Sequence, residues 1–146
     1  MTTTQVRTAT QNDSARIIAL LQANDLPTSD LADCRPEFVV IEDGDELIGT
    51  GGVQAFGNAA LVRSVAIAKD RQRAGLGSSL LGALERHASA LGIRELVLLT
   101  QTAEQFFTRH GYTRIERSSV PVPIQATAEF RSLCPASAVC MSKRLA

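Results

Sequence analysis

The stretch DRQRAGLGSSLL, residues 70–81, decides the fold class, because it joins a mostly apolar strand pattern to a helix pattern. Glycine has no Cβ, so Gly75 and Gly77 let a bulky group approach the backbone where the helix begins. The unpaired N–H groups and the positive dipole end of a helix start attract anions. The segment therefore predicts a diphosphate site, to which Arg71 and Arg73 would add cationic contacts.

The two glycines are also compatible with a tight strand-to-helix turn alone, with the arginines solvated. A P-loop is excluded, because no Gly-x-x-x-x-Gly-Lys-Ser/Thr motif occurs in the chain. A dinucleotide-binding fingerprint fits poorly: Leu80 stands where a third glycine is needed, and Glu95 begins the next strand instead of ending it.

The pattern around this stretch predicts an α/β protein with a mixed sheet and helices on both faces. Strands are expected over 5–8, in a hairpin over 37–56 around Asp43-Gly44, and over 59–67, 93–100, 112–116 and 137–145. A first helix is expected after the N-cap candidates Asn12 and Asp13, with Ile17, Ile18 and Leu21 on one face. A second helix is expected over 75–91, and its apolar face carries Leu76, Leu80, Leu81, Leu84, Ala88 and Leu91. A third helix is expected over 102–110.

Composition sets limits on function. The 146 residues form one expected domain, 1–146, and 15 basic residues balance 15 acidic ones, so no affinity for nucleic acid or membrane is expected. The sequence shows no apolar core of a signal peptide, and a cytoplasmic location is the expectation. Three cysteines do not form a disulfide framework. Cys134 and Cys140 lie too far apart on a strand pattern to share a metal, unless the chain folds back at Pro135, and no metal is expected.

QRAGLG, residues 72–77, resembles the Gln/Arg-x-x-Gly-x-Gly/Ala acyl-CoA loop of the GNAT superfamily of N-acetyltransferases. VRTATQND, residues 6–13, and TAEQFFTRHGYTRI, residues 102–115, are similar to the opening strand and helix cap and to the closing helix and strand of that family. The ending TAEFRSLCPASAVCMSKRL, residues 127–145, resembles a branch of small bacterial GNAT proteins associated with arsenic resistance and related to amino-acid acetyltransferases. The resemblance implies a GNAT fold, with a mostly antiparallel sheet and a central acyl-CoA cleft.

The resemblance also implies how acetyl-CoA would be held. The backbone of Val65, Ala66 and Ile67 would pair with the pantetheine arm, and an N–H near Ile67 would face the thioester oxygen. Backbone N–H groups of one loop would hold the diphosphate: Gln72, Arg73, Ala74, Gly75, Leu76, Gly77 and Ser78. Phe106 and Phe107 would pack near the arm, although aromatic residues on a helix are often plain core residues.

The catalytic residues are less well defined. Many members of the family use a tyrosine as general acid where this chain has Phe107, and the glutamate often found on the central strand is missing. Tyr112, Glu129 and Cys134 are the weak candidates that are left. Catalysis by positioning with a water relay is also compatible with these residues, because a thiol is a good leaving group.

Arg63 interrupts an apolar strand, and a buried guanidinium needs an anion. That anion is either an acid of the chain itself or a substrate carboxylate. Glu129 and Arg131 are the other substrate candidates, one for an ammonium and one for a carboxylate, although a solvated helix face explains them nearly as well. The histidines are expected to be structural, His87 exposed and His110 at a helix end.

Together these features predict an acetyl-CoA-dependent N-acetyltransferase whose acceptor is the amine of a small molecule, an amino acid or an amino-acid analogue. The arsenic association, which comes from the resemblance alone, would make that analogue a toxic one. A homodimer is compatible, since domains of this family often pair. The alternatives are an acyl-CoA-binding sensor without catalysis and a thiol-based arsenite-binding protein that uses Cys134 and Cys140.

Overall fold

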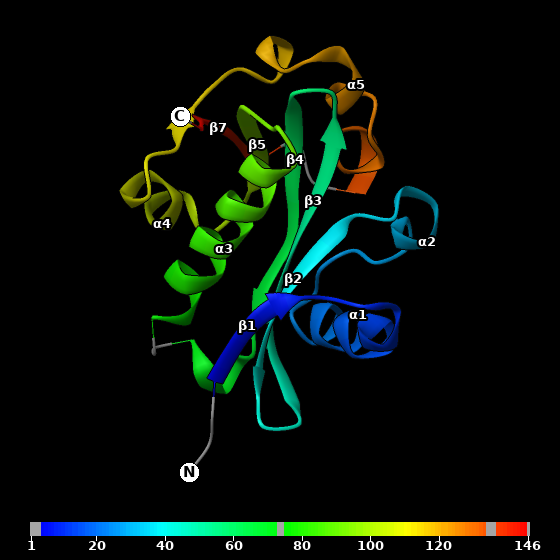
Figure 1. Cartoon of the computed structure of the whole chain (residues 1–146). Coiled ribbons are helices and arrows are strands. Elements are labelled where there is room, and N and C mark those ends of the chain that lie inside the picture. Colours follow the sequence, from blue (N-terminus) through cyan, green and yellow to red (C-terminus); the bar gives the residue numbers. More distant parts are fainter. Residues whose placement is uncertain (1–3, 73–74, 134–136, 146) are drawn as a thin grey trace.

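The structure is a computed structural model that describes residues 4–72, 75–133 and 137–145. Its centre is one seven-stranded sheet in the order β1-β2-β3-β4-β5-β7-β6 (Figure 1). Strands β4 and β5 run parallel, and the other neighbours are antiparallel. The strands are β1 Thr4–Thr8, β2 Glu37–Asp43, β3 Glu46–Phe56, β4 Ala59–Ile67, β5 Glu95–Thr100, β6 Thr113–Arg114 and β7 Val139–Arg144. The predicted α/β class and mixed sheet are confirmed.

Helices and short turns connect the strands. The α-helices are α1 Ser14–Ala23, α2 Leu31–Cys34, α3 Leu76–Ala90, α4 Glu104–Arg109 and α5 Val122–Gln125. Single 3-10 turns cover Gln11–Asp13, Lys69–Arg71 and Arg117–Ser119, and a π-helical turn covers Glu129–Leu133. Glycines with positive φ mark the predicted boundaries: Gly44 lies in the β2–β3 hairpin, Gly57 lies between β3 and β4, and Gly92 follows α3.

The helices lie on both faces of the sheet, as predicted. Helices α3 and α4 pack on one face, where Leu80, Leu84 and Phe107 join the largest apolar cluster (Figure 1). Helix α1 covers β2, β3 and the second half of β4 on the opposite face, and α5 covers β5 and β7 on that same side. Strand β5 is therefore apolar on both sides, with Leu96 and Leu98 in one cluster and Val97 in another.

Three details differ from the sequence prediction. Ile18 and Leu91 were expected on buried helix faces and are exposed, because each lies at the edge of its apolar stripe. Strand β6 is only two residues long, since the chain turns into the 3-10 turn at Arg117. His87 is half-buried, not exposed, and its Nε2 lies 3.3 Å from Oε1 of Glu37.

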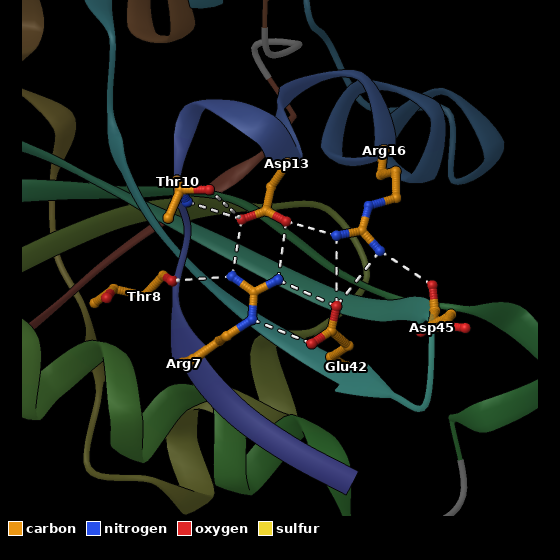
Figure 2. A network of polar contacts seen from close by, with 7 residues as sticks. All are labelled: Arg7, Thr8, Thr10, Asp13, Arg16, Glu42 and Asp45. Atoms are coloured by element: carbon orange, nitrogen blue, oxygen red, sulfur yellow. Dashed lines mark hydrogen bonds and ion pairs between the residues drawn. The ribbon is translucent and has the colours of Figure 1, made fainter. Parts of the chain in front are cut away.

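A polar network fixes the start of α1 against the first two strands (Figure 2). The buried carboxylate of Asp13 accepts hydrogen bonds from Arg7 at 2.8 and 2.9 Å, from Nη2 of Arg16 at 2.6 Å and from the backbone N–H of Thr10 at 2.8 Å. Glu42 of β2 accepts further bonds from both arginines. Asp13 thus ties β1 and the helix start together instead of capping α1 through its own side chain.

Candidate functional site

The site is a cleft between β4 and β5. The two parallel strands pair only from Ala59–Glu95 to Leu61–Val97, and beyond that point no pairing joins them. The second half of β4 borders a cavity of about 690 Å³, which the other strand borders with Leu98, Leu99 and Thr100. Parallel strands that separate expose backbone groups which neighbouring strands otherwise satisfy, so a ligand with an extended polar chain can pair there.

A bulge in β4 directs this separation. The register with β3 shifts between Gly52–Arg63 and Thr50–Ala66, and Ser64 has a φ of 58°. A positive φ is unusual for serine and persists only where the surrounding structure imposes it. Ser64 is buried and lines the cleft. The bulge follows Leu61, the last residue of β4 that pairs with β5, and bulges of this kind bend and twist a strand.

The backbone of β4 after the bulge faces the cleft at alternate residues. The N–H of Ala68 donates to Ile48 O of β3 at 2.8 Å, so strand alternation turns the backbone of Ala66 toward β3 and that of Val65 and Ile67 toward the cleft. The carbonyl of Ile67 accepts a bond from Nε2 of Gln72 at 3.1 Å. Of the three residues predicted to pair with the pantetheine arm, Val65 and Ile67 thus turn their backbone polar groups toward the cleft, and the pairing itself stays a prediction.

The predicted diphosphate loop leads from β4 into α3. Gly75 precedes the first helical residue with a φ of 72°, and a Cβ placed on it would meet no atom of the described residues within 4 Å. A Cβ on Gly77 would lie 3.3 Å from the ring of Phe106. Gly75, Gly77, Gln72 and Ser78 all line the cleft. The backbone N–H groups at the start of this 15-residue helix therefore border the cavity.

Some predicted loop contacts differ or lie elsewhere. Arg73 and Ala74 lie outside the described residues. Leu76 packs against the apolar core and is not among the residues that line the cleft. Arg71 does not line the cleft either: its Nη1 bonds Asp43 Oδ2 at 2.6 Å, and its Nη2 lies 3.4 Å from Glu46. Arg71 thus anchors the loop to the β2–β3 hairpin.

The aromatic residues of α4 form a wall of the cleft beside the start of α3. Phe106 and Phe107 both line the cleft, and their ring centroids are 5.2 Å apart. Phe107 is also a core residue, as one of the two alternatives raised by the sequence has it, and its packing near the pantetheine arm stays a prediction. His110 is the C-cap residue of α4, and its ring contacts Phe106 and lies 3.1 Å from Oγ of Ser78. This contact joins the closing helix to the first turn of α3.

The other end of the cleft holds a cluster of charged side chains around Arg63. The Arg63 side chain is 0% exposed, and its two terminal nitrogens bond both oxygens of Asp30 at 2.6 and 2.7 Å. Its Nη2 lies 3.6 Å from Oε1 of Glu129, and Cys34 Sγ and Gln54 Oε1 each lie 3.4 Å from Nη1. The structure therefore pairs Arg63 with acids of the chain itself, one of the two alternatives that the sequence left open.

The electrostatics of this cluster follow from its geometry. The hydrogen bonds from Arg63 hold the pKa of the Asp30 carboxyl below its usual range. Burial disfavours the charge on Arg63, but the bond to Asp30 and the charge of Glu129 outweigh that effect and raise its pKa. Burial raises the pKa of the Cys34 thiol, so this sulfur is protonated at neutral pH.

Tyr112, Arg131 and Cys140 are not among the residues that line the cleft. The hydroxyl of Tyr112 is buried and donates to Oε2 of Glu85 at 3.0 Å, and burial together with that carboxylate raises its pKa. This geometry favours packing over proton transfer at the cleft. Arg131 is exposed and does not line the cleft, and Cys134 lies outside the described residues. Cys140 is buried, which raises the pKa of its thiol to about 11.

Sequence reasoning missed Asp30, Cys34, Gln54 and Ser64. The sequence signal for Asp30 was the buried arginine itself, which requires an acid, but the many acids of the chain do not reveal which one.

A second cavity, of about 730 Å³, lies between α1 and the start of β2 and contains none of the predicted site residues. Within the ranges that the structure describes, no group of three or more His, Cys, Asp or Glu is placed to hold a metal ion. Over the same ranges, no helix is long and apolar enough to cross a membrane.

The cleft, the glycine loop and the layered sheet define an α/β protein in which two parallel strands separate beside a cavity that a helix N-terminus borders. A family model described as acetyltransferase (GNAT) domain matches residues 35–114, and the chain belongs to this family. The uncharacterized N-acetyltransferase YjcF of Bacillus subtilis (strain 168) is 30% identical over 77 residues, which cover 52% of this chain and 55% of that protein.

Solved structures confirm the GNAT fold. N-acetylglutamate synthase from Neisseria gonorrhoeae, in complex with coenzyme A and N-acetyl-glutamate, is 20% identical with a TM-score of 0.85. The similarity covers 99% of this chain and 35% of the synthase, so this chain spans about a third of the synthase. Rv2747 from Mycobacterium tuberculosis, in complex with CoA and NLQ, is 24% identical with a TM-score of 0.77 over 97% of this chain and 99% of that one.

Proposed function

We propose that this protein is an acetyl-CoA-dependent N-acetyltransferase whose acceptor is the amine of a small molecule. The observation that carries the proposal is the β4–β5 separation, which turns the backbone of Val65 and Ile67 toward a cavity that ends at the glycine loop of α3. An extended thioester arm would pair with β4 as an added strand, and its diphosphate would lie at the N-terminus of α3.

The residues present fit this cosubstrate. The absence of side chains at Gly75 and Gly77 leaves room at the helix start, and Phe106 offers an apolar surface beside it. Among the described residues, the loop contributes backbone N–H groups and the side chains of Gln72 and Ser78 to the cleft. Arg71 contributes indirectly, because its bond to Asp43 anchors the loop to the β2–β3 hairpin. Backbone recognition of this kind does not depend on the identity of the side chains.

In the proposed reaction, the acceptor nitrogen forms a bond with the acetyl carbon while the carbon–sulfur bond breaks, and the coenzyme leaves as a thiol. The N–H near Ile67 would stabilise the oxyanion that develops on the acetyl group. The amine must lose a proton to attack and the departing sulfur must gain one, and a water relay in the cleft would carry both protons. Glu129, at the acceptor end of the cleft, is the candidate that would receive the ammonium form of the acceptor. Neither Tyr112 nor Arg131 lines the cleft, so positioning would contribute most of the rate.

Within this proposal, the acceptor class is an amino acid or an amino-acid analogue. The ending TAEFRSLCPASAVCMSKRL supports this class through its resemblance to the arsenic-resistance branch, which would extend the acceptors to toxic analogues. The N-acetyl-glutamate bound to the Neisseria gonorrhoeae enzyme supports the same class of acceptor.

Release of free coenzyme thiol, measured with a thiol reagent on a panel of amino acids and simple amines, tests the proposal. Turnover that requires both acetyl-CoA and an amine supports it. Acetyl-CoA that stabilises the protein without any turnover would replace it by a sensor function. Arsenite binding that persists without acetyl-CoA and disappears when Cys134 and Cys140 are changed to serine would favour the thiol-based alternative.

A further inference from the structure

The acceptor end of the cleft has an unusual charge balance. Arg63 carries one positive charge, and the carboxylates of Asp30 and Glu129 that pair with it carry two negative charges. Asp25 adds another acid to the lining of the cleft. Of the described residues that line the cleft, only Arg63 carries a full positive charge, and Asp30 already neutralises it.

The geometry of the Asp30 pair matters as much as its charge. A guanidinium offers two parallel N–H groups to a carboxylate, which is the arrangement an amino-acid carboxylate would seek. Asp30 occupies both positions, with bonds of 2.6 and 2.7 Å. The Arg63 side chain is fully buried, whereas that of Asp30 is 14% exposed. Arg63 lines the cleft and Asp30 does not, but the two terminal nitrogens of Arg63 are already bonded to Asp30, so a carboxylate in the cleft finds this edge of the guanidinium occupied.

Asp30 is also held in place from the helix that follows it. Asp30 is the N-cap residue of α2, and its backbone carbonyl accepts bonds from the N–H groups of Asp33 and Cys34. The thiol of Cys34 lies 3.7 Å from Oδ2 of Asp30 and 3.4 Å from Arg63. These contacts fix the carboxylate in front of Arg63 from two directions.

We propose that Asp30 determines acceptor specificity: its carboxylate occupies the carboxylate-binding edge of Arg63, so the acceptor is recognised through its ammonium at Glu129 and not through a carboxylate at Arg63. This inference rests on the proposed transferase function and widens its acceptor class from amino acids to amines without a carboxylate. An amino acid then enters with its carboxylate turned away from Arg63. An amine that lacks the carboxylate therefore loses no binding contact at Arg63.

The test compares acceptors in matched pairs: phenylalanine with phenethylamine, alanine with ethylamine, and lysine with cadaverine. For the wild type, kcat/KM for each amine should equal or exceed that for the amino acid. In Asp30→Asn the guanidinium loses its anionic partner at this edge, and the ratio of amine to amino acid should fall by about tenfold or more. Asp30→Glu keeps the charge and should keep the wild-type preference.

Asp33→Asn is the matched control, because it removes an exposed acid from the same short helix and should leave the ratio unchanged. A wild type that prefers every amino acid over its matched amine by about tenfold would overturn the inference, and this result needs no variant to fold. An unchanged ratio in a folded Asp30→Asn protein would overturn it as well. Failure of the proposed function looks different: no acceptor of either kind then releases thiol.

Discussion

Replacement of Asp13 by asparagine should destabilise the protein near pH 7 and matter much less in acid. The Asp13 side chain is 2% exposed and accepts charge-assisted bonds from Arg7 and Arg16. Asparagine keeps the shape but turns these bonds into weaker ones, at about 1 kcal/mol for each partner. Since the two arginines are 28% and 39% exposed, solvent screening reduces the sum to about 1–2 kcal/mol, or a fall in Tm of about 3–6 °C.

The pH dependence follows from the direction of the shift. Hydrogen bonds from Arg7 hold the pKa of Asp13 well below its usual range, so its contribution to stability is present above the unfolded pKa of about 3.9. That contribution disappears as the pH falls through the folded pKa. Urea unfolding near pH 7 and at successively lower pH should therefore show the difference between wild type and Asp13→Asn shrinking in acid. Asp45→Asn, which changes an exposed acid beside the network, is the control. An equal difference at every pH would refute the reasoning.

Two further predictions concern packing and the tyrosine. Gly51→Ala should lower the unfolding free energy by about 1–3 kcal/mol, because its Cβ would lie 2.5 Å from Leu84 Cδ1. Gly82→Ala within α3 should instead raise the unfolding free energy by about 0.5–1 kcal/mol. Thermal unfolding of the two variants tests this, and changes of the same sign would contradict the packing described. Tyr112→Phe should leave kcat and its pH profile unchanged, because the Tyr112 hydroxyl bonds Glu85 away from the cleft. Initial-rate assays check this. A large fall in kcat in a protein that still binds acetyl-CoA would restore Tyr112 as a catalytic candidate.

Local patterns predicted most of the fold. The hairpin at Asp43-Gly44, the strand before the glycine loop and the leucine-rich helix after it are all where periodicity and turn residues placed them. Periodicity sets the face of a helix but not how far the neighbouring layer extends, and Leu91 is exposed for that reason. The two-residue strand β6 is short because of a turn that its apolar pattern does not show.

The sequence predicted more of the cleft lining at the glycine-loop end than at the Arg63 end. Backbone groups and glycines form the first, and both are encoded by one contiguous stretch. The second depends on contacts between distant segments: Arg63 on β4 meets Asp30 from the loop before α2 and Glu129 from the C-terminal part of the chain. A single sequence shows that Arg63 needs an acid, but only the fold shows which acids meet it.

Binding of acetyl-CoA to the glycine loop is the claim on which the account depends, and a thermal shift measures it directly. At about 100 times its dissociation constant, acetyl-CoA should stabilise the wild type by about 2.7 kcal/mol, a rise in Tm of about 5–10 °C. Gly75→Asp places a negative charge where the diphosphate would lie and should abolish the shift, while Gly75→Ala separates the backbone strain at φ 72° from the charge. A folded Gly75→Asp protein that keeps the full shift would contradict the site.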